Sequence, residues 1–128
     1  MKTDLSAPYK AASSTWRDSD ELKSAAHLWA ERINVNVLQI QVRLMRSKWA
    51  SISTAGRLTL NTDLLKIPKD LGEFVIVPEL VHLLMPNHGK VFKSFMYAYL
   101  PDWEEREQRL RMYSRSSEKR NQRKTPMS

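Results

Sequence analysis

The chain is 128 residues long, carries a net charge of +7 and contains no cysteine. This length predicts one domain, and a hydrophobic content of 41% supports one modest core. The lack of cysteine excludes disulfides and thiolate metal sites, and it is typical of a reducing compartment. Because no segment has the length and apolarity of a membrane span or a signal peptide, we expect a cytoplasmic protein that does not enter a membrane.

The first helix is expected after a flexible lead-in of residues 1–17, from which Trp16 docks on the body of the protein. The helix should cover residues 20–34, with Ser19 as its N-cap, since a Ser hydroxyl can accept a hydrogen bond from an N–H of the first turn. His27 lies on the polar face and is interpreted as a surface residue. Apolar residues at helical spacing form the buried stripe: Leu22, Ala25, Ala26, Trp29 and Ile33.

Three short strands are expected next, at residues 37–44, 48–54 and 57–61. Apolar and polar residues alternate in the first of them, which is typical of a half-buried strand. Ala55 and Gly56 supply the turn between the second and the third, because glycine tolerates positive φ. Three consecutive short strands predict an antiparallel meander.

The most apolar part of the chain belongs to a predicted central helix over residues 68–85. Pro78 stands inside this helix, where it has no N–H for the carbonyl of Phe74 and its ring crowds that carbonyl. The expected cost is about 3 kcal/mol in a helix interior. We therefore expect a kink or a split close to Pro78, or a helix that restarts with Pro78 in its first turn.

Two further helices should complete the domain, at residues 90–100 and 103–113, with Asp102 as N-cap of the second. The sequence then turns strongly basic, and we interpret this tail as disordered. A basic tail could bind nucleic acid through phosphate contacts, which carry no sequence information. The predicted organisation is a flexible segment at 1–17, a folded domain at 18–113 and a basic tail at 114–128.

A possible metal site lies in the central helix, where Pro78-Glu79-Leu80-Val81-His82 departs at one position from the motif His-Glu-x-x-His. That motif places two imidazoles on one helix face to bind zinc, and its Glu serves as general base for a metal-bound water. Glu79 and His82 hold the second and fifth places of the motif. His88, six residues further on, could return from a turn as another ligand, whereas Pro78 has no ligand atom.

This stretch, continued to Phe92, resembles the YgjP-like metallopeptidases, which are small zincin-type proteins. Their pattern is roughly V-x-H-E-L-x-H-x-x-x-x-N-H-x-x-x-F. Residues 49–61 resemble that family's Trp-x-Ser hairpin, and residues 99–106 resemble its closing segment. The likeness covers roughly residues 38 to 110, which is most of the chain.

The resemblance implies an α+β, zincin-like single domain with an N-terminal helix, a small antiparallel three-stranded sheet, a central motif helix and C-terminal helices. It also implies zinc as the cofactor, Glu79 as the catalytic base, and His82 and His88 as metal ligands, with the remaining ligand expected at the position of Pro78. In zincin-type hydrolases an edge strand lies beside the cleft, and a peptide or protein substrate can add to it as an extra strand.

Three functions follow from these observations. The first is a zinc-dependent, metallopeptidase-like hydrolase of amide bonds, weakened or inactive because Pro78 replaces a metal ligand. The second is a catalytically dead peptide-binding module of the same fold, and the third is a protein associated with nucleic acid through its basic tail. Taken singly, His82 would be a buried helix residue and His88 a loop residue. The sequence leaves open whether the chain is an active enzyme, what its substrate is, and its oligomeric state.

Overall fold

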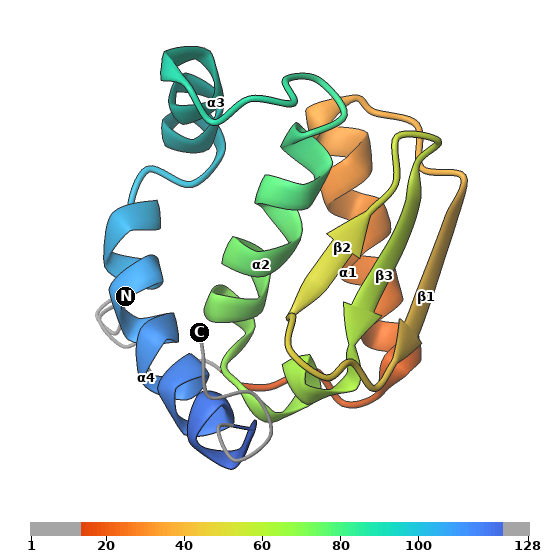
Figure 1. The fold of residues 1–128 in the computed structure, drawn as a ribbon. Helices are drawn as coiled ribbons and strands as arrows, with labels where there is room; N and C mark the ends of the chain where they lie inside the picture. Colours follow the sequence, from red (N-terminus) through yellow and green to blue (C-terminus); the bar gives the residue numbers. More distant parts are fainter. Residues whose placement is uncertain (1–13, 122–128) are drawn as a thin grey trace, which may run out of the picture.

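The computed structural model describes residues 14–121, with side chains described up to residue 113. One helix, then the three strands of a small sheet, then the remaining helices follow one another along the chain in an α+β arrangement (Figure 1). No helix in this part of the chain is long and apolar enough to cross a membrane. The elements are α1 (Ser19–Ile33), β1 (Gln39–Arg43), β2 (Ala50–Ile52), β3 (Arg57–Asn61), the 3-10 helix η2 (Thr62–Lys66), α2 (Lys69–Val81), α3 (Lys90–Tyr99) and α4 (Trp103–Asn121).

Helix α1 begins one residue earlier than the sequence predicts, because Asp18 and not Ser19 caps it. The Asp18 carboxylate accepts a hydrogen bond from the backbone N–H of Glu21 at 3.0 Å. A charged carboxylate also interacts favourably with the positive end of the helix dipole. The predicted docking of Trp16 is confirmed, since this side chain is 5% exposed and its ring lies against Gly72 of α2.

The sheet is mixed, with strand order β1-β3-β2, so the predicted antiparallel meander is wrong for β1. Strands β2 and β3 are antiparallel across the turn at Gly56, whose φ is 96°. Strand β1 instead runs parallel to β3, with Gln39 paired to Arg57 and Arg43 paired to Asn61. The connection between β1 and β2 has no tight-turn residues, and it crosses past the end of β3 to place β2 on the far side.

Asn61 holds this crossing connection in place. Its side chain is 4% exposed, and its amide donates hydrogen bonds to the carbonyls of Met45 at 3.1 Å and Lys48 at 2.7 Å. Its side-chain oxygen accepts a hydrogen bond from the backbone N–H of Asp63 and so caps η2. One buried polar side chain therefore joins the β1–β2 connection to the end of β3.

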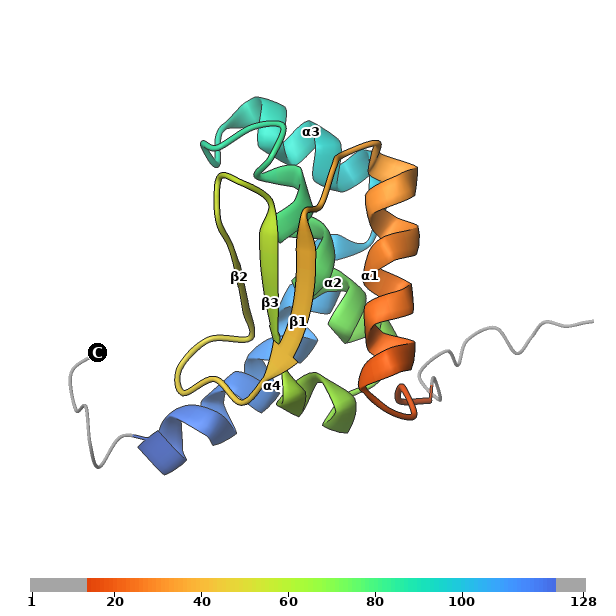
Figure 2. The ribbon, with the colours of Figure 1, turned by 90° about the vertical axis from the view of Figure 1, so that its right-hand side faces the viewer.

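Helix α2 is the central element of the core, and α1, α3, α4 and β2 all pack against it (Figures 1 and 2). The helix is continuous through Pro78, so the predicted split and the alternative restart at Pro78 are both wrong. It ends at Val81, earlier than predicted, because the next residues form a turn. The free energy gained by burying α2 on most sides offsets the cost of the backbone hydrogen bond that Pro78 cannot make. The buried residues of α2 are Leu71, Gly72, Val75, Ile76, Val77, Leu80 and Val81.

Two arginines of α4 form ion pairs with carboxylates of α2. Arg106 donates to the Glu73 carboxylate at 3.1 Å and to the Asp102 carboxylate at 2.9 Å. Arg109 donates to the Asp70 carboxylate at 2.7 Å. Burial raises the pKa of Asp70, but the hydrogen bond and charge of Arg109 outweigh burial and hold that pKa below its ordinary value. The α4 backbone remains helical to Asn121, so the predicted end near residue 113 is too early.

We expect Asn61→Ala to lower the free energy of unfolding by about 2–3 kcal/mol, because it removes two buried side-chain hydrogen bonds and a helix cap. Asn36→Ala, at an exposed position, should change it by less than about 0.5 kcal/mol. Urea unfolding of both variants measures the difference. Equal stability of the two variants would show that Asn61 does not hold the connection.

Candidate functional site

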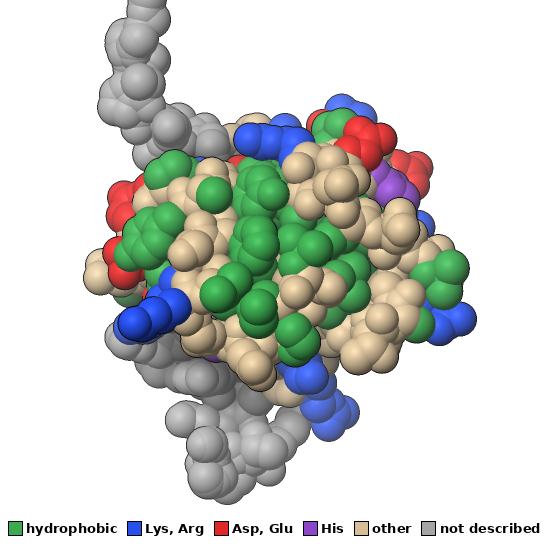
Figure 3. Space-filling model, turned by 90° about the horizontal axis from the view of Figure 1, so that it is seen from above, with side chains coloured by type: hydrophobic (Ala, Val, Ile, Leu, Met, Phe, Trp, Pro, Cys, Tyr) green, Lys and Arg blue, Asp and Glu red, His purple; other side chains and the backbone are tan. Residues whose placement is uncertain are grey.

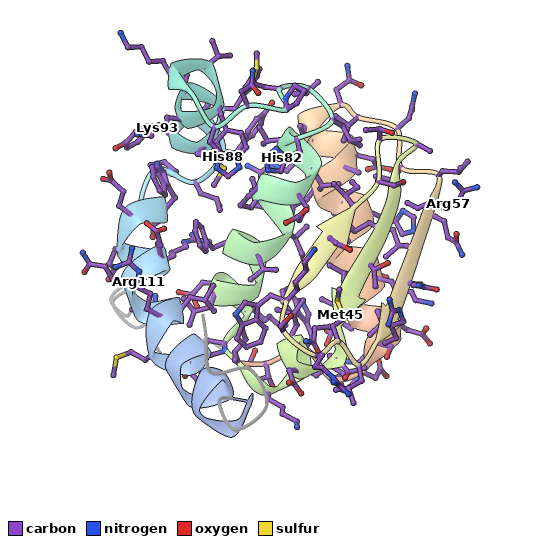
Figure 4. All side chains as sticks on the ribbon, viewed as in Figure 1. Met45, Arg57, His82, His88, Lys93 and Arg111 are labelled. Atoms are coloured by element: carbon purple, nitrogen blue, oxygen red, sulfur yellow. The ribbon has the colours of Figure 1, made fainter. Side chains whose placement is uncertain are left out.

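Two histidines meet at the end of α2. His82 directly follows the helix, and His88 lies in the connection that leads to α3. Their Nε2 atoms are 2.8 Å apart, and Figure 4 shows the two side chains next to each other between α2 and α3. The structure thus brings together the two imidazoles that the sequence singles out.

Phe92 of α3 fixes the orientation of both imidazoles. Its ring centroid lies 4.4 Å from that of His88 and 4.9 Å from that of His82, and the two imidazole centroids are 4.6 Å apart. The family pattern that the sequence resembles ends with a Phe four residues after its last His, so the resemblance already includes Phe92. The contact of Phe92 with both imidazoles is what the pattern alone does not give.

The protonation state of His82 suits metal binding. Burial, and then the nearby charge of His88, lower the pKa of His82 below its ordinary value, so its ring is neutral at pH 7. At 2.8 Å one ring nitrogen can donate a hydrogen bond to the other, and the tautomers decide which one donates. A neutral imidazole nitrogen with a free lone pair is also the form that binds a divalent cation.

Glu79 is the titratable carboxyl of α2 closest in sequence to the histidine pair. Its side chain is half-buried, and burial raises its pKa to about 7, while the positive charge of Lys48 opposes this effect. Lys48 lies just before β2, so the carboxyl sits on the side of α2 that faces this strand. A carboxyl that titrates near neutral pH can both accept and return a proton.

The described residues do not complete a catalytic zinc site. Such a site takes three protein ligands, with Zn–N distances of about 2.0–2.1 Å. Among the side chains of residues 14–113, no group of three His, Cys, Asp or Glu is placed to hold a metal. His82 and His88 can provide two ligands, whereas Pro78, half-buried in α2, provides no donor atom.

A cavity of about 310 Å³ opens near this site. It is bounded by residues 34–36 after α1, by residues 54–56 in the β2–β3 turn, and by Leu83 and Leu84 directly after His82. Figure 3 views the molecule from the α3 end. Hydrophobic side chains gather across the centre of the surface that this view shows. The cavity therefore combines apolar walls with polar groups at the end of an edge strand.

Comparison with known proteins identifies the fold. Residues 11–113 match the family model of the YgjP-like, metallopeptidase domain. The metallopeptidase zymogen jannalysin of Methanocaldococcus jannaschii is similar in structure, with a TM-score of 0.66 and 24% identity over 72% of this chain and 95% of that chain. The metallopeptidase zymogen abylysin of Pyrococcus abyssi gives a TM-score of 0.64 and 17% identity over 72% and 93%. No curated protein matches the chain. The predicted zincin-like α+β fold is confirmed.

The raised pKa of Glu79 predicts how stability depends on pH. Between pH 4.5 and about 7 the folded chain binds a proton at Glu79 that the unfolded chain releases, so stability should fall as pH rises through this window. Glu79→Gln should remove this fall and exceed the wild type in stability at pH 8. The gain in the free energy of unfolding should be about 1–3 kcal/mol. Partial solvation of the Glu79 carboxyl keeps this gain below what the full pKa shift would give.

Urea unfolding between about pH 4 and pH 8, in the presence of a metal chelator, tests this expectation. Glu31→Gln is the matched control, because Glu31 is exposed on α1 and should leave the pH dependence unchanged. Parallel stability curves for the wild type and Glu79→Gln would contradict the assignment.

Proposed function

Because the chain belongs to the YgjP-like metallopeptidase domain family, we propose that it is a peptidase-like hydrolase of amide bonds with its metal centre reduced to His82 and His88. One observation carries the proposal: the Nε2 atoms of these residues are 2.8 Å apart. The resemblance to the family puts the remaining ligand at position 78, where this chain has Pro78. Two imidazoles hold zinc less firmly than three ligands do. We therefore expect weak metal binding and slow hydrolysis.

Glu79 is the residue that we propose for proton transfer. Its pKa of about 7 leaves a large fraction ionised at neutral pH, so that its carboxylate can take a proton from water. The protonated carboxyl can then return that proton to the leaving amine. A bound zinc ion would supply polarisation of the scissile carbonyl and acidification of water.

The substrate that we propose is an extended peptide. Strand β2 is an edge strand of the sheet, so one side of its backbone has no partner strand in the described part of the chain. It packs against α2, the helix that carries Glu79 and leads into His82. A peptide added to β2 would reach the cavity beside Leu83 and Leu84 with an apolar side chain.

A second candidate function is peptide binding without hydrolysis. It is favoured by the lack of a third metal-binding side chain next to the histidine pair within residues 14–113. The edge strand and the cavity do not depend on a metal. In this case peptide affinity would be unchanged by a chelator.

Pro78→His tests the central proposal. It should raise zinc affinity by about 100-fold or more, since loss of even an outer hydrogen-bond partner of a zinc ligand costs about 10- to 100-fold. Hydrolysis of a fluorescence-quenched peptide library should rise with it. Calorimetric titration with zinc measures the affinity.

Pro78→Ala is the matched control, because it also removes the ring from the helix but adds no donor atom. Both substitutions should stabilise α2, by up to about 3 kcal/mol, and only Pro78→His should gain zinc. If the two variants bind zinc equally, position 78 is not the missing ligand. If Pro78→His gains zinc but neither it nor the wild type hydrolyses peptides, the binding function stands and the hydrolase function does not.

A further inference from the structure

The sheet is built from a stretch of chain without acidic residues. No Asp or Glu occurs between Glu31 and Asp63, and β1, β2 and β3 all lie within that stretch. Every charged side chain in it is therefore positive. These residues are Arg32, Arg43, Arg46, Lys48 and Arg57.

One face of this sheet is open. Side chains alternate along β1 and β3 up to Leu60, so that Ile40, Leu58 and Leu60 are buried while the residues between them are exposed or half-buried. Asn61, at the end of β3, is buried as well. The helices α1 and α2 pack on the buried face, and Figure 2 shows the strands in front of α2. The side chains on the open face are Gln39, Gln41, Arg43, Ser51, Arg57 and Thr59.

All six of these side chains can donate a hydrogen bond, and none is a carboxylate. Arginine, glutamine, serine and threonine are among the side chains that contact phosphate oxygens in nucleic-acid complexes. Because Arg57 pairs with Gln39 and Arg43 with Asn61, the two arginines stand four residues apart, or about 13 Å along the strands. One strand of a duplex places about four phosphates in that length.

We propose that this open sheet face binds duplex nucleic acid through its phosphate backbone, without sequence preference. A duplex is favoured over a single strand because none of the six side chains is an aromatic ring on which a base could stack, and the neighbouring Trp49 is half-buried and packs against the core. A membrane surface is disfavoured because none of the six is apolar. Figure 4 places Arg57 on the sheet side and His82 beside α3, so binding leaves the histidine pair open and is independent of the hydrolase function.

The C-terminal part of the chain carries a further excess of basic residues in its sequence. Helix α4 continues to Asn121, and its end lies on the same side of the molecule as the β1–β2 connection in both ribbon views (Figures 1 and 2). Residues 115–124 contain five basic residues and one acidic residue. An attractive field from this segment would speed association with a polyanion.

The test is fluorescence anisotropy of the full chain with a labelled duplex of about 20 base pairs, titrated between about 50 and 200 mM salt. We expect affinity to fall steeply with salt. The double variant Arg43→Gln/Arg57→Gln should bind about tenfold more weakly at the lowest salt. The slope of log affinity against log salt should fall in magnitude by about 2, since each lost phosphate contact removes about 0.9.

Lys90→Gln/Lys93→Gln is the matched control, because it removes the same charge from α3, far from Arg57 in Figure 4. It should leave affinity and slope nearly unchanged, and Arg43→Lys/Arg57→Lys should retain the wild-type slope. Equal losses in both Gln variants would overturn the proposal in favour of a net-charge effect. Binding to phosphatidylserine vesicles but not to the duplex, or no duplex binding at the lowest salt, would also overturn it.

Discussion

The burial of α2 is the constraint on which the rest of the structure depends. This helix must fill the core between α1, the sheet and the C-terminal helices, and more than half of its residues are buried. Phe74 stacks on Trp103, with ring centroids 6.4 Å apart, and Glu73 is engaged by Arg106. Towards the end of the helix Pro78 and Glu79 are only half-buried, and His82 follows directly after Val81. The same packing keeps the helix continuous through a proline.

The contacts between α4 and α2 show how the desolvation cost of charged groups at the edge of this core is compensated. The Arg106 side chain is 15% exposed, and besides two carboxylates it donates to the backbone carbonyl of Asp70 at 3.1 Å. The Trp29 indole donates to the same Glu73 carboxylate at 3.3 Å. Because each buried charge has several partners, the desolvation of these groups is compensated. A hydrophobic contact alone would not fix how far α4 is turned about its own axis.

Much of this arrangement could be predicted from the sequence, because local patterns determine it. Helical spacing located α1, the most apolar part of the chain located α2, and Gly56 located the β2–β3 turn. The order of the strands could not be predicted, since the partner of β1 depends on Asn61 and on a connection without local signals. For the candidate site, the motif spacing identified His82 and His88 as candidate ligands. Their contact with Phe92 and the burial of Glu79 depend on how α3 and β2 pack, which no residue spacing determines.

The mixed sheet has a consequence for the order of folding. Strands β2 and β3 are joined by a tight turn at Gly56, so this hairpin can close quickly and locally. Strand β1 pairs with β3 only after the chain has passed through β2, and parallel pairing of this kind requires closure of a longer loop. We therefore expect the transition state to contain the hairpin on α2, with β1 and α1 docking afterwards. The face that carries Arg43 and Arg57 would then be the last surface of the protein to form.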